Sequence, residues 1–76
     1  MQVNVTLWGN LRRFAPRGVG STVMELADKA TIEDLTIEIG AEHEVYAASV
    51  NGKVVALSTP LSPGDRVFLF DHLHGG

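Results

Sequence analysis

The sequence predicts an α+β domain in which one helix packs across one face of a mixed β-sheet. Apolar and polar residues alternate near the start of the chain and again near its end, which is typical of half-buried strands. Between them lies a stretch with apolar residues at helical spacing, followed by a strong hairpin signal. One helix and several strands are most simply arranged in two layers, with the first and last strands side by side.

The first predicted strand covers residues 3–8 and turns alternate side chains inward, namely Val3, Val5 and Leu7. A Gly-Asn break follows, and residues 11–15 are expected to form a short helical turn. The second predicted strand covers residues 21–26, with Met24 and Leu26 facing the core and Glu25 facing out. Both strands are expected to bury one face against the helix.

The helix is predicted from about Ile32 to Ile39. Thr31 can cap its N-terminus, and Asp34 lies where the acid of a capping box belongs. Gly40 is the expected stop. The apolar face of the helix consists of Ile32, Leu35 and Ile39, all expected to be buried.

The second half of the chain predicts a strand at 46–50, a short return strand from Val54, and a last strand at 66–71. Asn51-Gly52 indicates a two-residue hairpin turn, because a type I′ turn needs a positive φ at both central positions. A second turn is expected at 62–65, which reads Ser-Pro-Gly-Asp. We expect Val50 to belong to the core.

The last strand has aliphatic residues on one face and aromatic residues on the other. We expect Val67 and Leu69 to face the helix, because small aliphatic side chains suit a thin layer. Phe68 and Phe70 would then face outward as a surface that binds a partner. The alternative is that the two aromatic residues form the core.

Composition limits the classes of function. A chain of 76 residues forms one small domain with a thin core, which favours a carrier or binding role over a self-sufficient enzyme. The net charge of −3 does not match a nucleic-acid-binding surface. The absence of cysteine excludes a disulfide, a thiolate metal site and a thiol nucleophile, and is compatible with the cytoplasm. No run approaches the roughly 20 apolar residues of a membrane span.

Half of the basic residues lie in one short segment, at Arg12, Arg13 and Arg17. They are either a solvated loop or a surface that binds an acidic partner, with Arg12 and Arg13 as the candidate contacts.

The last two residues, Gly75 and Gly76, carry no side chains. A glycine pair is either a frayed end or an arm that can enter a narrow active site of another protein. The arm, residues 72–76, would reach about 16 Å beyond a domain formed by residues 1–71. His72, Leu73 and His74 would enter the partner's channel with the glycines and contact its walls. The alternative, a metal site at the two histidines, has too few ligands, so no metal is expected.

The order of elements and the glycine pair resemble the β-grasp, or ubiquitin-like, fold. Four segments are similar to prokaryotic sulfur carriers of the MoaD/ThiS family: 7–12 (LWGNLR), 30–35 (ATIEDL), 49–53 (SVNGK) and 61–67 (LSPGDRV). The segment 11–14 (LRRF) favours the molybdopterin synthase small subunit over the thiamine-pathway carrier, whereas a histidine near the end is familiar in the latter. The pathway therefore stays open.

The resemblance implies that the carboxylate of Gly76 is activated with ATP by a ubiquitin-activating-type adenylating enzyme. A sulfur donor then converts the acyl-adenylate to a thiocarboxylate, and a sulfur-accepting synthase subunit receives the sulfur. This chain would be the substrate, would bind no cofactor itself and would not be an enzyme. Two alternatives remain: a protein modifier that forms isopeptide bonds with lysines, as archaeal relatives do, and a β-grasp interaction module without tail chemistry.

Overall fold

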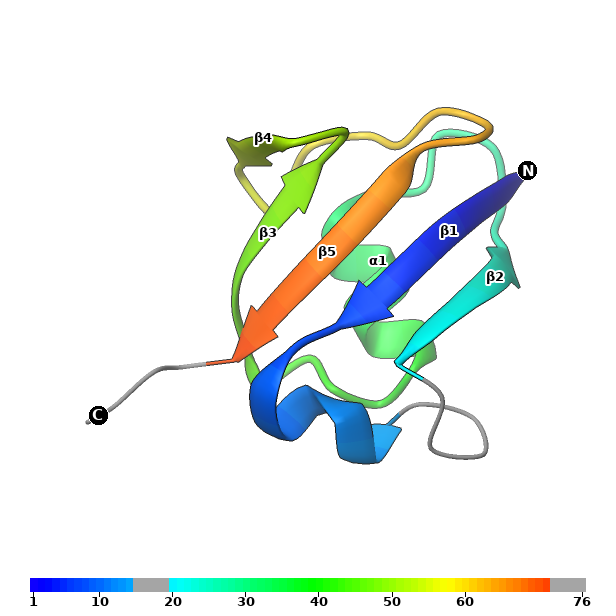
Figure 1. Cartoon of the computed structure of the whole chain (residues 1–76). Coiled ribbons are helices and arrows are strands. Elements are labelled where there is room, and N and C mark those ends of the chain that lie inside the picture. The colour runs from blue at the N-terminus through cyan, green and yellow to red at the C-terminus, as the bar shows by residue number, and fades with distance from the viewer. Residues whose placement is uncertain (15–19, 72–76) are drawn as a thin grey trace.

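The computed structural model describes residues 1–14 and 20–71, which form a five-stranded mixed sheet with one α-helix packed across one face (Figure 1). The elements are β1 (Gln2–Leu7), the 3₁₀ helix η1 (Gly9–Phe14), β2 (Ser21–Glu25), α1 (Ile32–Glu38), β3 (Val45–Val50), β4 (Lys53–Val55) and β5 (Arg66–Asp71). This arrangement confirms the predicted α+β architecture and each predicted element that falls within these residues.

The strand order is β2-β1-β5-β3-β4. The central strands β1 and β5 are parallel, with Val5 opposite Val67 and Leu7 opposite Leu69. The other neighbouring strands are antiparallel. Because β1 and β5 run the same way, their C-terminal ends lie at one edge of the sheet, where η1 begins (Figure 1).

The core lies between the sheet and α1. Val3, Val5, Val67, Leu69 and Leu35 are all buried, as predicted, together with residues from the loops and from η1: Leu11, Ala41 and Leu61. Three residues expected in the core are only half-buried, because each lies at its margin: Met24 on the edge strand β2, Ile39 at the helix end, and Val50 at the end of β3.

Both ends of α1 are closed by short-range hydrogen bonds. At the N-terminus, the Asp34 amide donates to Thr31 Oγ1 at 3.1 Å and the Thr31 amide donates to Asp34 Oδ2 at 2.9 Å, which completes the predicted capping box. At the C-terminus, Gly40 has φ +78°, and the Ala41 amide donates to the Thr36 carbonyl at 2.9 Å. This Schellman motif explains why glycine ends the helix.

The Asn51-Gly52 turn also fixes the start of β5. Asn51 and Gly52 both have positive φ, as a type I′ turn requires. The Asn51 side chain accepts a hydrogen bond from the Arg66 amide at 2.9 Å and donates one to Asp65 Oδ1 at 3.0 Å. One turn residue therefore joins two loops that are distant in the sequence.

The N-terminal ammonium is held between β2 and the turn that follows it. The Met1 nitrogen lies 2.8 Å from Glu25 Oε2 and 3.7 Å from Asp28 Oδ1, and it donates to the Leu26 carbonyl at 2.6 Å. The hydrogen bond with Glu25 raises the pKa of the ammonium above its usual 8.0 and lowers the pKa of Glu25 below its usual 4.5.

We expect this pair to give the free energy of unfolding a dependence on pH. The raised ammonium pKa stabilises the fold below about pH 8, and this contribution is lost as the pH rises through the raised value. The lowered Glu25 pKa stabilises the fold above about pH 4.5, and this contribution is lost as the pH falls through the lowered value. Urea unfolding across this range should show both decreases, and Glu25→Gln should reduce both. An unchanged alkaline decrease in Glu25→Gln would contradict the assignment.

Candidate functional site

The two faces of β5 have opposite roles. Val67 and Leu69 are completely buried under α1, whereas Phe68 and Phe70 are half-buried on the outer face of the sheet. The predicted facing of these residues is therefore confirmed, and the alternative in which the aromatic residues form the core is wrong.

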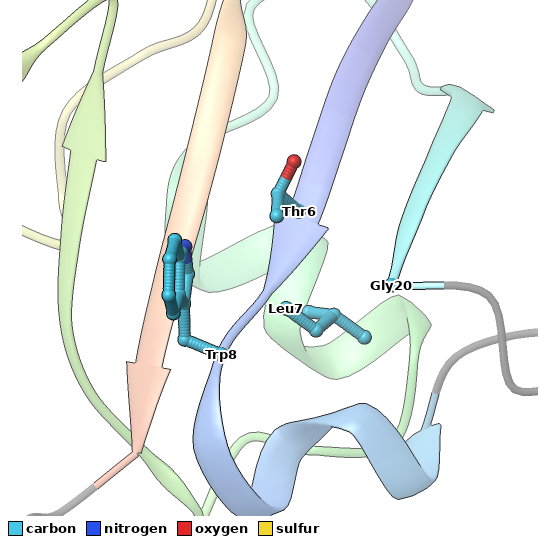
Figure 2. A pocket seen from close by; sticks show the side chains of 4 residues that line it. All are labelled: Thr6, Leu7, Trp8 and Gly20. Carbon is cyan, nitrogen blue, oxygen red and sulfur yellow. The ribbon is translucent and has the colours of Figure 1, made fainter.

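Trp8 joins the two phenylalanines, which the sequence analysis did not anticipate. It follows the last residue of β1, and its ring points over the neighbouring β5 (Figure 2). The centroid of the Trp8 ring lies 6.1 Å from the centroid of the Phe68 ring and 6.3 Å from that of the Phe70 ring. The Trp8 plane is inclined to these two ring planes by 27° and 22°. These stacked contacts, each in the range of favourable aromatic pairs, define the aromatic patch: Trp8, Phe68 and Phe70.

Small side chains beside the aromatic patch leave it accessible. Ser49 and Ala47 of β3 lie opposite Phe68 and Phe70 in the antiparallel register. The indole of Trp8 is half-exposed, and Val54 of the edge strand β4, opposite Ser49, is 76% exposed. The outer face thus offers apolar surface that continues from Trp8 toward β4, a feature that marks interaction sites.

A shallow pocket of about 190 Å³ lies next to the aromatic patch. It is lined by Thr6, Leu7, Trp8 and Gly20, where the end of β1 meets the start of β2 (Figure 2). A second pocket of about 300 Å³, at the other end of β1, is lined by Gln2, Val3, Asn4, Val23, Gly64 and Arg66. Neither lining combines a general acid with a general base.

The predicted basic contacts are only partly described. The Arg13 guanidinium lies 3.1 Å from Glu44 Oε1 and 4.8 Å from the centroid of the Phe14 ring. Arg13 is thus already paired on a partly exposed surface, where such pairs contribute little to stability. Arg12 is in η1, but its side chain is not described. Arg17 lies outside the described residues.

The predicted arm, His72, Leu73, His74, Gly75 and Gly76, also lies outside the described residues. Within residues 1–14 and 20–71, no group of three or more histidines or acidic residues could hold a metal ion. Over the same residues, no helix is long and apolar enough to cross a membrane.

The mixed sheet with β1 and β5 parallel at its centre and one helix across one face is the ubiquitin-like fold. The ThiS family matches residues 5–76, so the chain belongs to the ThiS family. Small proteins of the MoaD/ThiS type are carriers rather than enzymes.

Solved structures agree with this assignment. A putative molybdopterin converting factor, subunit 1, from Pyrococcus furiosus is 28% identical, with a TM-score of 0.74 over 95% of this chain and 98% of the other. SAMP1 from Haloferax volcanii covers 100% of both chains with a TM-score of 0.74, and its 24% identity shows the shared fold alone.

One curated relative is a much larger protein. A threonine–tRNA ligase from Protochlamydia amoebophila is 45% identical over 51 residues, which are 67% of this chain. The chain spans 7% of the length of that ligase. The match therefore concerns one small region of the ligase.

We expect substitutions on the two faces of β5 to differ in their cost to folding. Leu69→Ala should lower the free energy of unfolding by about 2–5 kcal/mol, because it leaves a cavity in a fully buried position. Phe68→Ala should cost much less than the roughly 3–5 kcal/mol of a core phenylalanine, because its ring is half-buried on the outer face. Urea unfolding of both variants measures the difference, and equal losses would contradict the division of the faces.

Proposed function

We propose that this chain is a sulfur carrier that works through the carboxylate of Gly76 in the cytoplasm. The observation that carries the proposal is the place of β5: this central strand contributes Phe68 and Phe70 to the exposed aromatic patch, and residues 72–76 follow it in the sequence. The five residues after β5 reach at most about 16 Å, so a partner bound at the aromatic patch would have the Gly76 carboxylate close to it. Membership of the ThiS family, whose match includes residue 76, supports the same function.

The chemistry assigns catalysis to partners. A carboxylate is a poor electrophile. A carboxylate oxygen of Gly76 attacks the α-phosphorus of ATP on an adenylating enzyme of the ubiquitin-activating type, and pyrophosphate leaves. A sulfur nucleophile then attacks the carbonyl carbon, and AMP leaves. The product is a thiocarboxylate, in which one sulfur replaces one oxygen. This chain has no cysteine to perform the step itself.

The residues have distinct proposed roles in this sequence of reactions. The aromatic patch binds the adenylating enzyme, and Arg12 and Arg13 add contacts to acidic groups. His72, Leu73 and His74 contact the walls of the partner's channel, and Gly75 allows close approach to the nucleotide because it has no Cβ. A synthase subunit then accepts the sulfur for molybdopterin or a related cofactor, a choice supported by the 28% identical converting-factor subunit.

Deleting Gly76 should abolish adenylation, because the reacting carboxylate is then one residue short of the nucleotide. The free energy of unfolding should change by less than about 0.5 kcal/mol, the usual range for surface changes. Pyrophosphate release with the cognate adenylating enzyme measures the first effect, and urea unfolding measures the second. Extending the chain with one alanine after Gly76 is the matched control and should also block the reaction. Retained activity in the deletion variant would refute the proposal.

Mass spectrometry separates the carrier from the alternatives. A sulfur carrier purified from its own cells should show the mass gain of sulfur replacing oxygen, localised to the peptide that contains Gly76. Localisation is required because oxidation of Met1 or Met24 gives the same nominal gain. High-mass conjugates joined through Gly76 to lysines would instead identify a modifier. If neither product is found, the remaining alternative is an interaction module without tail chemistry.

A further inference from the structure

Gly9 and Asp71 meet at the C-terminal ends of the central strands β1 and β5. The last pair of the parallel register is Leu7 with Leu69, and the Trp8 amide then donates to the Leu69 carbonyl at 3.0 Å. Two residues further along each strand come Gly9, which starts η1, and Asp71, which ends β5.

The Asp71 side chain occupies the space that a side chain at position 9 would need. A Cβ atom built on Gly9 would lie 2.9 Å from Asp71 Cγ and 3.0 Å from Asp71 Oδ2, closer than ordinary packing permits. Gly9 also has φ +63°, a conformation that residues with a side chain rarely adopt. The glycine thus turns the chain from β1 into η1 and admits the carboxylate at the same time.

Asp71 is an unusual residue for this place. Alternation along β5 puts it on the inner face with Val67 and Leu69, and it is only 8% exposed. Burying an acidic side chain is costly unless its oxygens have hydrogen-bond partners, and no buried side-chain oxygen of the described residues lacks one. A small apolar residue would fill an inner-face position at lower cost, so the acid at the last position of β5 calls for a role beyond packing.

We propose that the Gly9–Asp71 contact fixes the root of the C-terminal arm, so that Asp71 is a positioning residue for the reaction at Gly76. This proposal rests on the proposed sulfur-carrier function. With Asp71 held against Gly9 at the start of η1, β5 keeps its position up to its last residue, and only residues 72–76 follow it in the sequence. Without the contact, Asp71 would no longer be fixed at the end of β5. At least one further backbone residue would then have to be ordered when the carboxylate reaches the nucleotide, at a cost in conformational entropy.

The contact therefore affects the step after docking. Asp71 is on the face of β5 opposite Phe68 and Phe70, so its replacement should leave the aromatic patch in place and keep the KM for the carrier within about twofold of the wild-type value. Ordering one further backbone residue should lower kcat for adenylation by about tenfold. If Asp71 served only the stability of the fold, its replacement would lower the melting temperature but would not lower kcat at an unchanged KM.

The test compares Asp71→Ala with Glu42→Ala, which removes one exposed acid elsewhere and should behave as wild type. Pyrophosphate release with the cognate adenylating enzyme gives kcat and KM. Amide hydrogen exchange reports the contact independently of activity: the Trp8 amide should exchange about tenfold faster in Asp71→Ala, while the Asn4 amide, bonded to the Asp65 carbonyl at the other end of β1, should not change. If Asp71→Ala does not fold, Asp71→Ser provides the same measurements.

Gly9→Ala disturbs the same contact from the other side and should lower kcat similarly. The double variant should lose less than the product of the two single losses, because both remove one interaction. Unchanged exchange at Trp8, or faster exchange with unchanged kcat, would overturn the proposal. Adenylation of the Gly76 deletion variant would instead refute the sulfur-carrier function, and this proposal with it.

Discussion

The parallel pairing of β1 with β5 is the interaction on which the rest of the structure depends. It places the first and the last strand of the chain together in the centre of the sheet, with Val5 opposite Val67 and Leu7 opposite Leu69. The inward residues of this pair of strands form the side of the core that faces α1 (Figure 1). The same pairing brings Trp8 over Phe68 and Phe70 and brings Gly9 to Asp71.

The two-residue period of a strand lets β5 serve stability and recognition at once. Its buried side, Val67 and Leu69, contributes apolar area removed from water. On its outer side, the half-buried Phe68 and Phe70 stack against Trp8. Aromatic rings held in this way lose little conformational freedom when a partner binds, which suits a small carrier with a thin core.

Short polar side chains hold the connections of the fold without a large core. Thr31 and Asp34 close the start of α1, and Asn51 joins the hairpin turn to Asp65 and to the start of β5. The bonds of Thr31 and Asp34 span three residues, and those of Asn51 join two loops that are close in space. Each therefore depends on few other contacts. These bonds hold the start of α1 and the Asn51 turn in place without using the outer face of the sheet.

The sequence by itself determined the features that arise from neighbouring residues. The alternation of Val3, Val5 and Leu7, the capping residues around Ile32, and the positive φ of Asn51 and Gly52 all follow from local sterics and hydrogen bonding. The tertiary structure alone decided which distant residues meet. The stacking of Trp8, the burial of Asp71 and the marginal positions of Ile39 and Val50 depend on strand register and on where each element ends. Local periodicity encodes which face a side chain occupies, but not which partner strand lies beside it.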